Sequence, residues 1–326
     1  IVILNMMNKK YLHLLFTALI TITVNAQKPI LFMGATAHLG NGEVIENSLI
    51  MFREGKIIFV GSSNTKIRRI GRIIMANGKH IYPGFIAANS TLGLVEVDAV
   101  KASSDVRETG IMNPHIRSII AYNAESKVVE SMRPNGVLMA QITPRGGTIS
   151  GTSSVVQLDA WNWEDAIIKA DEGIHLNWPR PYTRGRYWLG EDPALKVNKN
   201  YLSNIEKLKA FVENAKVYDL KQNPAHLPYQ AMKGLFNGTK TMYLHATDEK
   251  QIVDGISYLK ELGIDKIVLV GGNESPEQLK FIKEANIPVI VSRPHRLPDN
   301  EDEDPKQSFK LASQLIQAGI LVSIDV

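Results

Sequence analysis

Apolar and polar positions follow their most regular pattern in the second half of the chain. From about residue 239 onward, continuous apolar runs of strand length alternate with longer amphipathic segments. A continuous apolar run predicts a strand buried on both faces, and apolar residues three or four positions apart predict a helix. The pattern predicts helices at 248–264, 275–287 and 304–320, between strands at 239–246, 265–272, 288–294 and 321–325. Such units indicate an α/β protein, with a parallel sheet or barrel covered by helices.

Residues 28–83 follow a different pattern, that of short strands separated by turns. The turn pairs are Asn41-Gly42, Glu54-Gly55 and Asn77-Gly78, each flanked by apolar runs. Each pair predicts a hairpin-like unit. Three such units predict a small β domain over 28–83 that buries little apolar surface by itself.

Residues 95–190 have no regular period and are predicted to be a flap or insertion. The stretch "TPRGGTISGTSS" is rich in Gly, Ser and Thr, and an apparent strand, "GVLMAQI", precedes it. Gly146 and Gly147 allow the backbone to approach a ligand closely. A binding loop and an ordinary β-hairpin flap both fit this segment. After it, apolar residues at helical spacing predict a helix over 200–218.

The N-terminus has the pattern of a secretory signal peptide. Lys9 and Lys10 precede an apolar run, from about Tyr11 to Val24, and Ala26 offers a small residue for cleavage. The run is short for a membrane span, so we expect residues 1–27 to be a signal peptide. This predicts a secreted or periplasmic protein with no stable membrane anchor after cleavage. A buried or anchoring N-terminal helix is the alternative.

Composition narrows the chemistry that the chain can perform. There is no cysteine, which excludes disulfides, thiolate metal sites and thiol nucleophiles. The net charge is only +4, and Lys and Arg are scattered along the chain. The basic cluster at 66–72 alternates with isoleucines, which favours a solvated face over a nucleic-acid site, so no nucleic-acid partner is predicted.

The stretch "YPGFIAANSTLG", residues 82–93, carries a family resemblance. Together with "GNGEVIENSLIMFREGKIIFVG" before it and "YLHATDEKQIVDGISYLKELGIDKIVLVGG" after it, it resembles the amidohydrolase superfamily, and most closely its secreted imidazolonepropionase-like branch. The resemblance implies a (β/α)8 TIM-type barrel over 84–326 and a small N-terminal β-sandwich. It also implies metal-assisted hydrolysis of C–N bonds, often in cyclic amides. Against that pattern the barrel is expected to be incomplete, and the chain truncated, at the C-terminus.

The usual metal ligands are mostly missing from the matching positions. The family's first-strand His-x-His pair is replaced by Asn89-Ser90-Thr91, and Gly271 or Gly272 falls where the sixth strand carries a histidine. His245 matches the fifth-strand histidine, and Asp325 is the candidate for the last-strand acid. An amide and a hydroxyl are poor zinc ligands, so the resemblance implies a divalent metal site, for zinc, that is weakened or absent.

His245 is the candidate catalytic residue, as a general acid or base or as a metal ligand. Asp325 is a second, weaker metal candidate. His175 and His295 are weaker candidates, because an exposed loop position fits each better. The acidic run 301–304 suits a solvated loop better than a cation site. The predicted substrate-binding residues are Asn89, Thr91, Arg145, Gly146 and Gly147.

Two kinds of function remain open. The first is an extracytoplasmic hydrolase that acts on C–N bonds of a small-molecule substrate, other than peptide bonds, with a degenerate metal site. The second is a catalytically inactive relative, which either binds a small molecule or serves as an interaction subunit for an intact homologous amidohydrolase.

Overall fold

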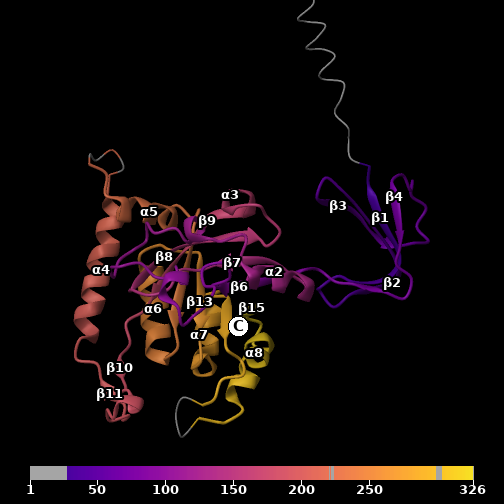
Figure 1. Cartoon of the computed structure of the whole chain (residues 1–326). Coiled ribbons are helices and arrows are strands. Elements are labelled where there is room, and N and C mark those ends of the chain that lie inside the picture. Colours follow the sequence, from indigo (N-terminus) through magenta and orange to yellow (C-terminus); the bar gives the residue numbers. More distant parts are fainter. Residues whose placement is uncertain (1–27, 220, 222–223, 299–302, 326) are drawn as a thin grey trace, which may run out of the picture. The chain divides into compact units, whose positions relative to one another are not determined.

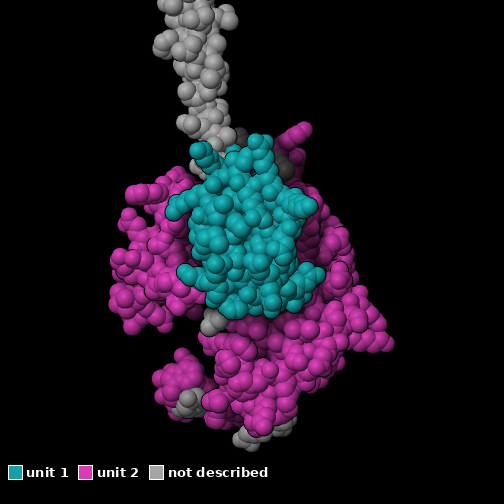
Figure 2. Space-filling view, turned by 90° about the vertical axis from the view of Figure 1, so that its right-hand side faces the viewer, with its two compact units in different colours: residues 1–83 teal, residues 84–326 magenta. Residues whose placement is uncertain are grey.

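The computed structural model describes residues 28–219, 221, 224–298 and 303–325, so the predicted signal peptide lies outside the described residues. The chain divides into two compact units, residues 1–83 and 84–326, which Figure 2 colours separately. Within the described ranges, no helix has both the length and the apolar character that crossing a membrane requires.

The first unit is one five-stranded sheet in the order β3-β2-β1-β4, with β5 also paired to β1. Leu31, Leu49 and Met51 form its small buried cluster. The predicted hairpin at Asn77-Gly78 is wrong, because β4 and β5 both run parallel to β1 in successive registers. The described residues of this unit therefore form a single sheet. Its strands are β1 (Ile30–His38), β2 (Val44–Arg53), β3 (Lys56–Ser62), β4 (Arg72–Met75) and β5 (His80–Ile81).

The second unit is built on an eight-stranded sheet in the order β15-β14-β13-β12-β9-β8-β7-β6 (Figure 1). Its strands are β6 (Phe85–Ser90), β7 (Val137–Ile142), β8 (Ile149–Gln157), β9 (Ile167–Asn177), β12 (Thr241–Ala246), β13 (Ile267–Gly271), β14 (Val289–Ser292) and β15 (Val322–Asp325). Two short strands, β10 (Tyr182–Thr183) and β11 (Lys196–Val197), pair separately. The helices are α2 (Lys127–Met132), α3 (Trp163–Ala166), α4 (Tyr201–Val217), α5 (Leu227–Phe236), α6 (Glu249–Glu261), α7 (Leu279–Glu284) and α8 (Gln307–Gln317).

The sheet curls into a nearly closed barrel. Its two end strands meet where the Asn89 side chain on β6 donates a hydrogen bond to Asp325 on β15. The barrel was expected to be incomplete, but its sheet has eight strands. The segment 95–190, expected to be a flap or insertion, supplies three of them: β7, β8 and β9. Strand β8 runs antiparallel to both neighbours, which departs from an eightfold repeat of parallel strand–helix units.

The two faces of the barrel strands differ in polarity. On β12, Met242, Leu244 and Ala246 are buried on the outer face, whereas Tyr243 and His245 face the interior. The outer face packs on α4 to α8 in the main hydrophobic core. Burial of this apolar face stabilises the unit, at roughly 25 cal/mol per Å². The interior holds polar side chains such as His245 and Tyr243 beside apolar ones such as Val270.

Candidate functional site

A cavity of about 540 Å³ opens at the carboxyl ends of the parallel strands, and we call it the mouth pocket. This end of a barrel is where active sites are found. Three arginines line the pocket, and no aspartate or glutamate lies among the lining residues. The lining includes Gly147, Arg180, His245, Ser292, Arg293 and Arg296.

His245 lies in the wall of this pocket and contacts a second histidine. Its Nε2 atom is 2.8 Å from Nδ1 of His175, on the neighbouring strand β9. His175 is fully buried, and its ring stacks on Tyr243 with the centroids 4.6 Å apart. The Nε2 atom of His175 has no hydrogen-bond partner among the residues that the structure describes. The two imidazoles are thus coupled inside the barrel.

Both histidines are neutral at neutral pH. Burial, followed by the charge of Arg145, lowers the pKa of His245 from 6.5 to about 3. Burial, followed by the charges of His245 and Arg145, lowers the pKa of His175 well below its ordinary value. A neutral imidazole contributes one donor and one acceptor, without a charge.

The predicted residues Asn89, Arg145 and Asp325 form one cluster. Arg145 donates from Nη1 to the Asn89 side-chain oxygen and from Nη2 to its carbonyl, both at 2.6 Å. The Asn89 Nδ2 atom donates to Oδ2 of Asp325 at 2.5 Å, and Ser292 donates to the same oxygen at 2.8 Å. A partly buried guanidinium is therefore connected to a buried carboxylate through the Asn89 amide. Burial lowers the pKa of Arg145, and the charge of Asp325 opposes that shift.

A buried carboxylate lies further inside the barrel. Glu172 is only 5% exposed. It accepts hydrogen bonds from Gln141 and Ser153, both at 2.6 Å, and from the Tyr243 hydroxyl at 3.0 Å. The side-chain oxygen of Gln141, Oε1, accepts a hydrogen bond from the Asn89 backbone N–H. Hydrogen bonds thus connect the Arg145 cluster to the base of the His175 stack.

The structure separates Thr91 from this cluster, whose members Asn89, Arg145 and Asp325 do not line the mouth pocket themselves. Asn89 adopts a left-handed backbone with φ of 48°, and the β6–β7 register shifts beside it. The strand alternation that would point Asn89 and Thr91 the same way is therefore broken. Thr91 lies beyond the end of β6 and does not line the mouth pocket. Gly146 and Gly147 do line it.

Gly147 is a position that only glycine fits. Its φ is +65°, and a Cβ atom there would lie 2.8 Å from the Ile111 carbonyl oxygen. Its own carbonyl accepts from the Asn177 side chain at 2.9 Å, and so it fixes the loop to β9. Gly271, the predicted replacement for a ligand, ends β13 and also lines the pocket.

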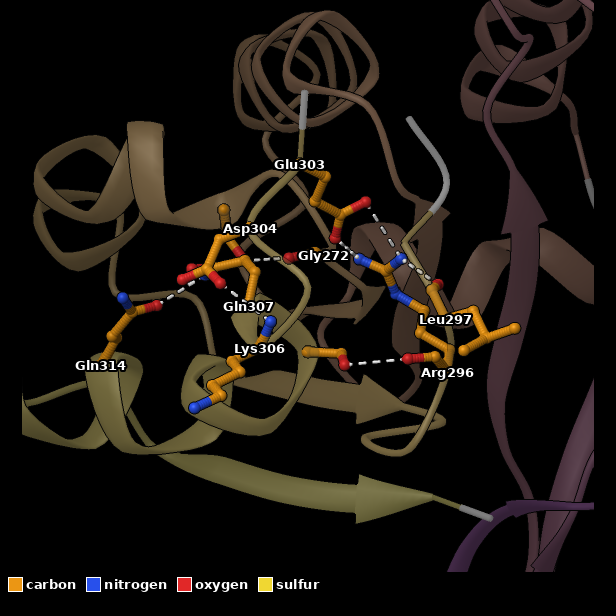
Figure 3. A network of polar contacts seen from close by, with 10 residues as sticks. Gly272, Arg296, Leu297, Glu303, Asp304, Lys306, Gln307 and Gln314 are labelled. Atoms are coloured by element: carbon orange, nitrogen blue, oxygen red, sulfur yellow. Dashed lines mark hydrogen bonds and ion pairs between the residues drawn. The ribbon is translucent and has the colours of Figure 1, made fainter. Parts of the chain in front are cut away.

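The acidic run is partly outside the described residues, and its described part is paired. Glu303 forms an ion pair with Arg296 at 2.6 Å, drawn in Figure 3. Asp304 pairs with Lys310 at 2.5 Å. One of the three pocket arginines is therefore neutralised locally. His295 is exposed, contacts the Phe309 ring and does not line the pocket.

The donors at the mouth do not fit a divalent ion. The described residues contain no group of three or more His, Asp or Glu side chains that could hold a metal. Each of the two predicted ligands has one donor atom engaged, because His245 Nε2 faces His175 and Oδ2 of Asp325 accepts from Asn89 and Ser292, which leaves only His245 Nδ1 and Asp325 Oδ1. Zinc sites in proteins need at least three such ligands.

Three residues of the candidate site were missed or undervalued from the sequence. His175 was expected in an exposed loop, because Pro179 follows it, yet it lies within β9 and is buried. Glu172 and Gln141 were not considered at all. Their signal is weak: polar residues recur inside apolar strands, and only the strand pairing brings them together.

No protein-family model matches the chain, and no curated protein matches it either. Among solved structures, an amidohydrolase from Thermotoga maritima MSB8 is similar, with a TM-score of 0.69 and 21% identity over 91% of this chain and 78% of the other. This similarity shows that the two share a fold. Two others align less closely. Ochratoxinase from A. niger has a TM-score of 0.47 and 12% identity over 92% and 76% of the chains. N-acyl-D-glutamate deacylase from Bordetella bronchiseptica, complexed with zinc and a phosphonate inhibitor, has a TM-score of 0.38 and 14% identity, over 92% of this chain and 58% of the other.

Proposed function

We propose that this chain is an amidohydrolase-type hydrolase that cleaves C–N bonds other than peptide bonds, with cyclic amides as the first substrates to test, and that it acts outside the cytoplasm. The observation that carries the proposal is the placement of His245. It lies at the carboxyl end of a barrel strand, in the wall of the mouth pocket, on a fold shared with a solved amidohydrolase. The signal-peptide pattern of residues 1–27 supports the location.

The chain's own residues supply two parts of such a reaction. His245 is neutral, so it can hydrogen-bond an amide carbonyl in the pocket without bringing a charge. Asp325 uses Oδ2 for its two hydrogen bonds, and Oδ1 accepts none from the described residues. In the proposed step, Oδ1 takes a proton from water as the water oxygen bonds to the carbonyl carbon. The proton then passes to the leaving nitrogen as the C–N bond breaks.

The residues do not fit a divalent ion, so no part of this scheme passes through a metal. The test is hydrolysis of cyclic amides and N-acyl amino acids by the purified protein, compared with His245→Ala and Asp325→Asn. Loss of at least about 100-fold in kcat for Asp325→Asn is expected for a general base. Activity that survives both substitutions would overturn these assignments.

A second candidate function is binding without catalysis, either of a small molecule or of an intact homologue. It is favoured by one observation: Asn89, Arg145 and Asp325 satisfy one another, as a structural cluster would. Absence of hydrolysis, together with a small molecule or a homologous subunit that copurifies, would support this alternative. Zinc content, measured in the same preparation, checks the fit of the donors independently.

A further inference from the structure

The mouth pocket presents hydrogen-bond donors and positive charge. Arg180 and Arg293 line it, and neither forms an ion pair within the described ranges, whereas Arg296 is neutralised by Glu303. Arg293 holds a left-handed backbone with φ of 50°, which is costly for a residue with a side chain and persists where the surroundings fix it. Guanidinium groups recognise carboxylate and phosphate oxygens through paired hydrogen bonds.

The histidine pair decides what His245 presents to this pocket. The contact between His245 Nε2 and His175 Nδ1 requires one proton between them. If His245 donated it, His175 would carry its own proton on Nε2, which is buried without a partner. An unpaired buried N–H is rarer in proteins than an under-used acceptor.

The alternative arrangement avoids that cost. His175 then donates from Nδ1 to Nε2 of His245, and its own Nε2 is unprotonated. The proton of His245 lies on Nδ1. Nδ1 of His245 has no hydrogen-bond partner in the part of the chain that the structure describes, and His245 lines the pocket. The buried pair therefore turns His245 into a donor toward a bound molecule.

We propose that the mouth pocket is an oxyanion-binding site, in which His175 holds the neutral His245 as an Nδ1–H donor and Arg180 and Arg293 supply the charge. The bound group is a carboxylate or a phosphate of a small molecule. His175 is a positioning residue here, because it acts only through His245. The proposal goes beyond hydrolysis and stands without it, since it concerns what the pocket binds.

The position of the proton is tested by NMR on protein labelled with ¹⁵N at histidine. Long-range ¹H–¹⁵N correlations distinguish a protonated from a bare ring nitrogen. We expect His245 to carry its proton on Nδ1 and His175 to have a bare Nε2. A proton on His245 Nε2 would overturn this part of the proposal, whatever the enzyme's activity.

Anion binding is tested by titrating inorganic phosphate and, separately, acetate, against sodium chloride at equal ionic strength, with thermal melting as the readout. A saturable rise in melting temperature with either anion is expected, and the preferred one shows which oxyanion geometry fits. Arg180→Gln and Arg293→Gln should each weaken binding about tenfold, as for one lost charged hydrogen bond. Arg53→Gln, an exposed arginine of the other unit, should not change it.

His175 variants separate positioning from general damage. His175→Phe removes the donor to His245 and should weaken anion binding by about threefold to tenfold. His175→Asn keeps an N–H near the same place and should restore both the affinity and the Nδ1 proton. No saturable effect with either anion, or equal losses in Arg53→Gln and Arg293→Gln, would refute the site.

Discussion

Tyr243→Phe is the sharpest probe of the polar barrel interior. The change removes one hydroxyl that donates to Glu172 at 3.0 Å and keeps the ring that stacks on His175. Burial and the charge of Glu172 raise the pKa of Tyr243, so the hydroxyl keeps its proton and donates. A hydrogen bond to a charged group contributes about 1.5–3 kcal/mol. Because Glu172 is buried, water cannot replace the lost donor, and we expect a loss near 2 kcal/mol.

The matched control is Tyr201→Phe. That hydroxyl also donates to a carboxylate, Asp254, at 2.7 Å, and it accepts a long contact from Trp178 Nε1 at 3.5 Å. Asp254, however, is 34% exposed and pairs with Lys250, so water and the lysine compensate. We expect this variant to lose no more than about 1 kcal/mol.

The assay is thermal unfolding followed by tryptophan fluorescence. All four tryptophans lie in the second unit, so the signal reports the barrel alone. For a domain of this size, a loss of 2 kcal/mol lowers the melting temperature by roughly 4–8 °C. Equal midpoints for the Tyr243 and Tyr201 variants would show that the interior network does not stabilise the barrel as argued.

Three further outcomes follow from the structure. The pKa of His245 falls from 6.5 to about 3 on folding, so the unfolded chain binds more protons between these values. Stability should be full above about pH 6.5 and fall below it by up to about 1.4 kcal/mol per pH unit, which urea melts of the wild type against His245→Asn can measure. Gly147→Ala should cost more than Gly190→Ala, by roughly 1–3 kcal/mol in melts, because both have positive φ but only the first meets a carbonyl. Leu244→Ala, in the core, should cost about 2–5 kcal/mol in the same assay, against under about 0.5 for the exposed Leu321→Ala.

The sequence predicts those parts of the fold in which the buried residues are apolar and recur with the period of a strand or a helix. Strands β12 to β15 and their helices follow continuous apolar runs and were placed within a few residues. Strand β8 escaped prediction, because its residues Ser150 to Ser154 are small and polar, yet buried. Their hydroxyls bond to other segments, as Thr152 does to the Pro114 carbonyl, so burial there is not visible as hydrophobicity.

The site was less predictable than the fold, because its contacts join distant parts of the chain. His245 stood out through its place after a strand, but His175 lies 70 residues earlier and had no local signal. Asn89 and Asp325 are 236 residues apart in the sequence, and only closure of the barrel brings their side chains into contact. Arg145 was predicted to contact the substrate. It lies in a loop, where no sequence periodicity predicts the path of the chain, and so its hydrogen bond to Asn89 could not be foreseen.

Strands β6 and β15 meet through side chains, without a backbone ladder between them. This line is therefore a seam between the two end strands, and the hydrogen bond from the Asn89 amide to Asp325 crosses it. Several ladder bonds must break together between the other strands, whereas rotation of the Asn89 side chain breaks the hydrogen bond that crosses this line. We expect transient opening of the barrel to begin along this seam, so that amide protons of β6 and β15 exchange with solvent before those of β12.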